Sequence, residues 1–138
     1  MVFAIIILRF EQFSSDISKL RFEDLEVWKK SAALCSDIYK NAYNFRDINF
    51  KGQITRSALS ISSNIAEGFE RESDRECIRF LFYAKGSCGE LRSQIYIGIK
   101  IGYIEKQMGF KWIEQATEIS YMICSLIKTK KRFIILKS

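Results

Sequence analysis

A stripe of polar side chains along one predicted helix is the feature of this sequence best suited to chemistry. Its members recur at alternating spacings of four and three residues, with two further polar residues beside them: Gln53, Ser57, Ser60, Asn64 and Glu67, flanked by Arg56 and Ser63. Serine and asparagine are mediocre helix formers because they compete for backbone hydrogen bonds. The stripe is therefore a solvated face, a helix–helix or subunit interface, or a ligand site. We favour the interface, since small hydroxylated side chains let two helices approach closely.

Two glutamates suggest a catalytic site as an alternative to the interface. Glu67 and Glu90 would form a carboxylate pair if their helices pack antiparallel, and Arg56 would complete a hydrolytic or nucleolytic pocket. Paired carboxylates are suited to general acid–base catalysis. A salt bridge from either glutamate to Arg56, Arg79 or Arg92 is the simpler interpretation. We therefore expect no enzyme activity, no catalytic residue, no small-molecule substrate and no cofactor.

The chain has no histidine, which removes several classes of reaction centre. Ser-His-Asp triads, HExxH zinc sites and the Glu-x-x-His pairs of di-iron bundles all require it. The cysteines are Cys35, Cys77, Cys88 and Cys124, and none lies in a C-x-x-C pair. We interpret them as small buried side chains in a reducing compartment, and we expect no metal site.

Small residues also gather in a second predicted helix, where Ser87 lies between Gly86 and Gly89. A glycine inside a helix costs up to about 1 kcal/mol relative to alanine. Two of them indicate that another backbone passes close by, and the serine-rich stripe is the expected neighbour. A phosphate-binding loop is excluded because the P-loop and dinucleotide spacings are absent.

The positive charge of the chain is concentrated near its end. Residues 1–99 carry a net charge of +1 and residues 100–138 carry +5, chiefly from Lys128, Lys130, Lys131 and Arg132. This cluster could bind phosphate backbones, with Phe133 nearby to stack on a base. The alternative is a helix end whose cations complement the helix dipole. A sequence pI near 9.2 is compatible with a nucleic-acid partner.

Four segments with helical periodicity must position these residues. They cover about residues 24–43, 51–67, 73–102 and 105–130, with short connections and no proline anywhere in the chain. Gly68 and Gly102 are expected to end the second and third helices, and Ser73 and Glu76 to form a capping box. The expected apolar stripes are Leu25, Trp28, Ala32, Cys35, Tyr39 and Ala42; Ile54, Ala58, Ile61 and Ile65; Cys77, Leu81, Ala84, Cys88, Leu91, Ile95 and Gly98; and Trp112, Ala116, Ile119, Ile123 and Leu126.

The predicted fold is all-α, an antiparallel up-down-up-down four-helix bundle over residues 22–132. Residues 1–21 form an extension that is a strand, an extra helix or a disordered arm. Residues 133–138 form a short apolar tail that could fold back onto the bundle. The apolar run at residues 2–8 is too short to span a membrane and lacks the charged start of a signal peptide. We therefore expect a cytoplasmic protein without a membrane partner.

Residues 22–28 and 53–68, followed by matching positions within 73–91, resemble the family of 23S rRNA intervening-sequence proteins. The run Ser-Asn-Ile-Ala-Glu-Gly at residues 63–68 is the most specific part of this resemblance. The resemblance covers about residues 22–130. The matching signature positions are Gln53, Arg56, Ser57, Ser60, Asn64, Glu67, Gly68, Ser73, Glu76, Ser87 and Glu90.

The resemblance implies a small bacterial four-helix-bundle protein that assembles as a cyclic homo-oligomer, with pentamers known for this architecture. It implies no catalytic residue. The family name records where some of the genes lie and does not by itself imply RNA binding. We expect a non-enzymatic homo-oligomeric ring that binds structured RNA or a ribonucleoprotein through its basic surface. The alternative is a protein–protein scaffold with no nucleic-acid role, in which the serine-rich stripe is the seam between subunits.

Overall fold

The computed structural model describes the backbone of residues 1–18 and 21–138, and their side chains except those of residues 10 and 14–18. All regular secondary structure in these ranges is helical: α1 (Val2–Ser18), the short 3-10 helix η1 (Phe22–Asp24), α2 (Glu26–Ala42), α3 (Ile48–Glu70), α4 (Asp74–Lys100) and α5 (Lys106–Lys137). The all-α prediction is confirmed. Of the alternatives for the first residues, the structure has a helix.

Helix boundaries follow from capping groups and from one left-handed glycine. Asp47 caps α3, its carboxylate accepting a hydrogen bond from the Phe50 amide at 2.9 Å. Glu105 caps α5 by accepting from the amides of Gln107 at 3.1 Å and Met108 at 2.9 Å. These two amide bonds lower the pKa of the Glu105 carboxyl. Gly102 has φ +79°, which confirms that it terminates the third predicted helix.

Two predicted helix ends were wrong. Gly68 does not end α3, which continues to Glu70. Alanine at position 68 would place its Cβ 3.2 Å from the Cys77 carbonyl oxygen, so this glycine is needed for close packing against α4. The apolar tail does not fold back, because α5 continues through it to Lys137 and buries Phe133.

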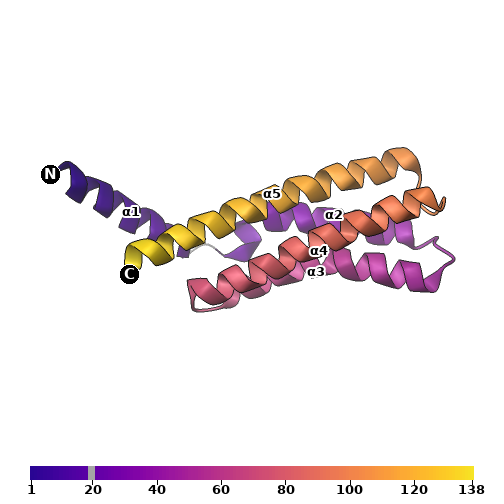
Figure 1. Cartoon of the computed structure of the whole chain (residues 1–138). Coiled ribbons are helices and arrows are strands. Elements are labelled where there is room, and N and C mark those ends of the chain that lie inside the picture. The colour runs from indigo at the N-terminus through magenta and orange to yellow at the C-terminus, as the bar shows by residue number, and fades with distance from the viewer. Residues whose placement is uncertain (19–20) are drawn as a thin grey trace.

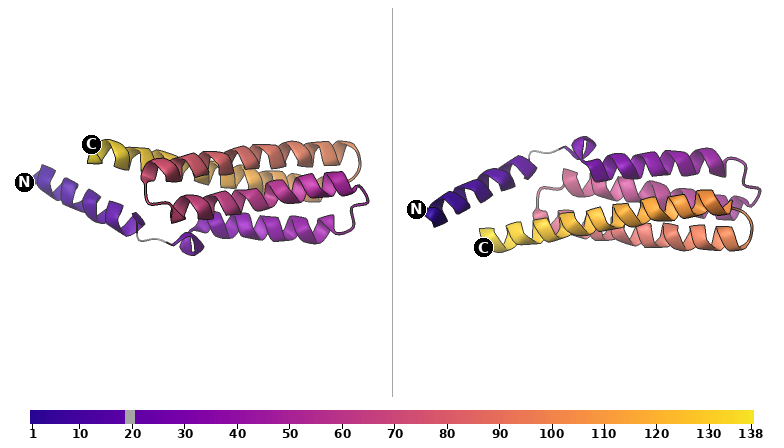
Figure 2. Two further views of the ribbon diagram at one scale, coloured as in Figure 1. Left: turned by 90° about the horizontal axis from the view of Figure 1, so that it is seen from below. Right: turned by 90° about the horizontal axis from the view of Figure 1, so that it is seen from above.

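Helices α2 to α5 lie alongside one another, and α1 extends away from them (Figures 1 and 2). α4 packs against α3 and α5, and α2 packs against both α3 and α5. α3 and α4 run in opposite directions, since Gly68 lies against Cys77 while Ser60 contacts Ser87. Helices α2 and α5 also run in opposite directions, since Lys30 contacts Glu118 while Asp37 contacts Trp112.

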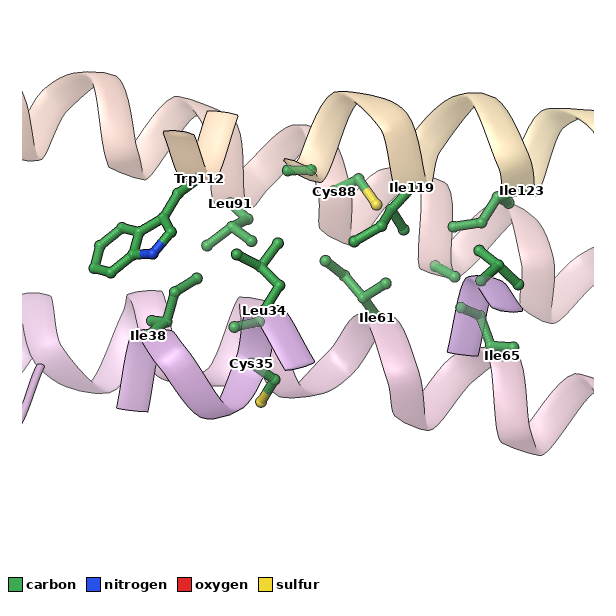
Figure 3. Close-up of a cluster of buried hydrophobic side chains, with 14 of the residues drawn as sticks. Leu34, Cys35, Ile38, Ile61, Ile65, Cys88, Leu91, Trp112, Ile119 and Ile123 are labelled. Carbon is green, nitrogen blue, oxygen red and sulfur yellow. The ribbon is translucent and has the colours of Figure 1, made fainter. Parts of the chain in front are cut away.

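The core is formed by the apolar stripes that these helices turn toward one another (Figure 3). The predicted stripes of α3 and α4 are buried throughout. In α5, Leu126 is only partly buried and Ile127 takes its place. The predicted stripe of α2 was right in part: Leu25, Cys35 and Ala42 are buried, but Tyr39 is 45% exposed. The other buried positions are Val27, Ser31, Leu34 and Ile38.

The four cysteines are free, and Cys35, Cys77 and Cys88 are buried. Burial raises the pKa of the Cys88 thiol to about 12. The expectation of small buried side chains is therefore confirmed for these three, while Cys124 is partly exposed. None of the described helices is both long enough and apolar enough to cross a membrane.

Candidate functional site

The serine-rich stripe of α3 contacts α4 of the same chain at its centre, through Ser60. Ser60 and Ser87 share a hydrogen bond with their hydroxyl oxygens 2.9 Å apart. Asn64 donates its side-chain amide to the Ser60 carbonyl at 2.8 Å and to the Ser60 hydroxyl at 3.0 Å. Ser57 is buried and donates to the Gln53 carbonyl at 3.1 Å. The centre of the stripe is thus a polar seam within one chain, while the Gln53 and Arg56 side chains are exposed.

The signature residues at the α3–α4 turn form local contacts. Ser73 caps α4 by accepting a hydrogen bond from the Glu76 amide at 3.1 Å. The Glu76 carboxylate lies 3.6 Å from the Arg79 guanidinium rather than returning to Ser73. Half of the predicted capping box is therefore present. Glu67 accepts a hydrogen bond from Arg71 at 2.7 Å, one turn further along the chain.

Glu67 and Glu90 do not form the predicted carboxylate pair. Ser60 faces Ser87, and the two glutamates lie in opposite directions from this contact, which separates them by about 15 Å along the helix axes. Each glutamate has a neighbour on its own side: Glu67 has Arg71, and Glu90 accepts from Gln94 at 3.5 Å. The pocket suggested for Glu67, Glu90 and Arg56 is therefore not assembled in this chain.

Gly86 and Gly89 lie in open space rather than under another backbone of the same chain. A Cβ atom added at either position would meet no atom within 4 Å. The small residues of α4 were expected to face the serine-rich stripe. Ser87 contacts the stripe through Ser60, but Gly86 and Gly89 do not meet it. No packing within the chain compensates for the lower helix propensity of these two glycines. The space beside them is open to a contact from outside the chain.

The basic cluster of α5 divides into one buried and three exposed cations. Lys128, Lys131 and Arg132 are exposed. Lys130 is 6% exposed and donates a hydrogen bond to the Asp74 carboxylate at 3.0 Å. Its ammonium also lies 5.2 Å from the centre of the Phe69 ring. Lys130 therefore holds α5 to the start of α4, and we leave it out of any proposed nucleic-acid contact.

Asp74 is the acidic partner in this arrangement. Burial by itself would raise the pKa of the Asp74 carboxyl, but the hydrogen bond and charge of Lys130, together with Lys137, outweigh burial and lower it. Lys137 is the more exposed of the two lysines, and its ammonium lies 3.4 Å from the carboxylate. The pair with Lys130 is thus the buried part of a three-residue charge cluster.

Sequence reasoning missed the part of the basic surface that belongs to α4. Arg75 and Arg79 are exposed near the start of that helix. Lys131 of α5 lies 5.3 Å from the centre of the Phe82 ring, and Phe82 is 45% exposed. Arg75 and Phe82 are seven residues apart and so share a helix face. The seven-residue spacing can be read from the sequence and places Arg75 and Phe82 on one face of α4. Only the folded chain shows that Lys131 of α5 lies next to Phe82.

The comparisons with known proteins agree on the family. A family model described as 23S rRNA-intervening sequence protein matches residues 23–125. Among solved structures, the chain is similar to a protein of unknown function from the S23 ribosomal protein family of Bacteroides thetaiotaomicron VPI-5482. The two are 27% identical with a TM-score of 0.70, covering 74% of this chain and 98% of that chain. No curated protein matches the chain.

Proposed function

The chain belongs to the 23S rRNA-intervening sequence protein family, and we propose that it is a non-enzymatic cytoplasmic protein that assembles with copies of itself into a ring. In this proposal, α2 to α5 form an antiparallel up-down-up-down four-helix bundle. The opposed directions of α3 and α4, and of α2 and α5, support that topology. The separation of Glu67 from Glu90 supports a role without catalysis.

The outer face of α4 is the observation that carries the proposal. Its residues follow a four-three-four-three spacing: Phe82, Gly86, Gly89, Ser93 and Tyr96. This outer stripe lies about 200° around the helix from the buried stripe, because each residue advances by about 100°. α4 therefore has two helix-packing faces, and the chain itself covers only the inner one.

The outer stripe has the composition of a contact between closely packed helices. Large side chains stand at both ends, where Phe82 is 45% exposed and Tyr96 is 54% exposed. Between them, the two glycines leave space for a neighbouring backbone. A helix from a second copy would fill that space and bury the aromatic rings, which offsets the helical cost of the glycines.

Gly86→Gln tests this arrangement. Glutamine is a good helix former, and the position is open within the chain. We therefore expect the isolated fold to gain up to about 1 kcal/mol of unfolding free energy. The same side chain would block a neighbouring backbone, so the assembled mass in sedimentation velocity should shift toward the monomer.

Gly52→Gln is the matched control, because Gly52 is also exposed in a helix with no atom within 4 Å of an added Cβ. It lies in α3, outside the outer stripe, and should leave the assembled mass unchanged. Assembly of Gly86→Gln identical to wild type over the whole concentration range would exclude the outer face of α4 as the subunit contact.

A second role, RNA binding, is favoured by the exposed cations where the end of α5 meets the start of α4. Lys128, Lys131 and Arg132 on α5 and Arg75 and Arg79 on α4 are exposed, and Lys131 lies against the Phe82 ring and so links the two helices. Cations bind nucleic-acid phosphates by charge attraction, whatever the base sequence. We propose that the ring of subunits binds RNA through this surface.

The salt dependence of RNA binding tests the second role. Lys128→Ala combined with Arg132→Ala should weaken binding and flatten the slope of log K against log[salt] by about 0.7–0.9 for each phosphate that is no longer neutralised. Lys106→Ala combined with Lys111→Ala removes two exposed cations from the other end of α5 and should leave the slope unchanged. An equal reduction in binding for both pairs would mean that only net charge matters, and absence of binding at low salt would end the RNA proposal.

A further inference from the structure

The exposed apolar surface of α1 is unusual for a helix outside a protein core. Figure 2 shows α1 pointing away from α2 to α5. Residues 2–8 are all apolar, and five of them are more than half exposed: Val2, Phe3, Ile6, Ile7 and Leu8. At about 100° per residue these side chains point to every side of the helix, so one neighbouring helix would cover only a fraction of them. This first part of α1 therefore favours an apolar environment on all of its sides, whereas the part from Arg9 onward carries polar and charged residues.

The structure places α1 against the end of α5 that carries exposed cations. The Phe13 ring of α1 packs edge-on against Phe133 of α5, with the ring centres 6.1 Å apart. Arg132 directly precedes Phe133, and Lys128 and Lys131 are exposed on the preceding turns. The last turn of α5 adds two apolar side chains, Ile135 at 70% and Leu136 at 62% exposure. Apolar and cationic groups thus meet at the same end of the molecule.

We propose that α1 and the end of α5 dock the protein on a membrane surface rich in anionic lipid. The apolar side chains of α1 enter the boundary between headgroups and acyl chains, and Arg9 stays at headgroup level. The cations of α5 contact lipid phosphates. An apolar insertion combined with a cluster of basic residues gives the two signals that stable attachment to a membrane surface requires.

The apolar run of residues 2–8 is long enough to lie in a membrane surface but too short to cross the bilayer. Residues 2–8 extend about 10 Å along the helix axis, whereas the hydrocarbon core of a bilayer is about 30 Å thick. The proposal departs from the expectation of no membrane partner, which rested on the lack of a spanning segment. It also goes beyond the proposed function, because α1 lies outside the family match at residues 23–125.

Co-sedimentation of the full chain with lipid vesicles tests the proposal. We expect binding to vesicles of phosphatidylcholine mixed equally with phosphatidylglycerol, weaker binding to phosphatidylcholine alone, and loss of this difference at high salt. Ile6→Ser combined with Leu8→Ser should lower the partition coefficient by about tenfold or more. Both side chains are largely exposed, so the fold and the circular dichroism spectrum should not change.

Ile48→Ser is the matched control, because Ile48 is 83% exposed at the start of α3 and should not affect vesicle binding. The proposal is overturned if the wild type binds neither vesicle, or if the α1 variant binds as well as the wild type. It is also overturned if the α1 variant lowers the assembled mass without lipid, since α1 then joins copies of the chain. The α1 variant should still bind RNA. Its RNA binding and its vesicle binding can therefore be tested separately, so that failure of the membrane proposal is distinguished from failure of the RNA proposal.

Discussion

Asp74→Ala is expected to lower the unfolding free energy by about 3 kcal/mol, as measured by urea denaturation at neutral pH. The substitution leaves the Lys130 ammonium, which is 6% exposed, without the carboxylate that it contacts at 3.0 Å. A buried cation without its partner is more costly than the removal of an exposed pair. Asp74 also lies in the first turn of α4, where a negative charge complements the helix dipole.

The neighbouring Lys137 provides a control on the same carboxylate. Its side chain is 59% exposed, and an exposed ion pair contributes about 0–1 kcal/mol. Lys137→Ala should therefore change the unfolding free energy by less than about 1 kcal/mol. Equal effects of the two substitutions would mean that the burial of Lys130 does not matter for stability.

The contribution of Asp74 to the unfolding free energy should disappear at acidic pH. Its pKa in the folded protein lies below the ordinary value of 3.8, so folding favours the charged form. The stabilisation is fully present above that ordinary value and is lost as the pH falls through the lowered pKa. The difference in unfolding free energy between wild type and Asp74→Ala should therefore be constant at neutral pH and shrink below about pH 4.

Trp112→Ala is expected to have the other large effect, a loss of about 3–5 kcal/mol of unfolding free energy. Trp112 is fully buried between α5 and α2 (Figure 3), and its indole nitrogen donates to the Asp37 carboxylate at 2.6 Å. The substitution leaves a cavity and removes a charge-assisted hydrogen bond. Both changes weaken the packing of α2 against α5.

Trp112→Phe separates these two contributions. Phenylalanine keeps most of the buried ring but cannot donate a hydrogen bond to Asp37, so a smaller decrease of about 1–3 kcal/mol is expected. Phe110→Ala is the control on the same helix, because Phe110 is 45% exposed. A decrease below about 1 kcal/mol for Trp112→Ala would contradict the packing described for the core.

Periodicity predicted the helices best where apolar residues alternate with polar ones. Ile54, Ile61 and Ile65 of α3 lie in a single stripe, and all three are buried. In α2 two overlapping apolar stripes compete, and Tyr39 was assigned to the core in place of Ile38. Tyr39 turns its side chain outward, while Leu34 and Ile38 fill the core beside Trp112. Periodicity within one helix does not reveal which of two apolar stripes the other helices cover.

The candidate site shows the same limit. The serine-rich stripe was predicted to be an interface, and within the chain Ser60 alone forms a hydrogen bond to another helix, with Ser87. Lys130 looked like its basic neighbours, because its partner Asp74 lies on another helix and becomes its neighbour only on folding. The glycines of α4 were correctly identified as unusual, but the sequence could not show that the space beside them is empty within the chain.

The subunit count of the full chain in native mass spectrometry tests the central claim most directly. The outer stripe of α4 predicts a discrete multiple of the 16.1 kDa chain, with a pentamer expected from the family resemblance. Gly86→Gln should shift that species toward 16.1 kDa, and Gly52→Gln should not. A wild-type protein that stays at 16.1 kDa at every concentration would contradict the account.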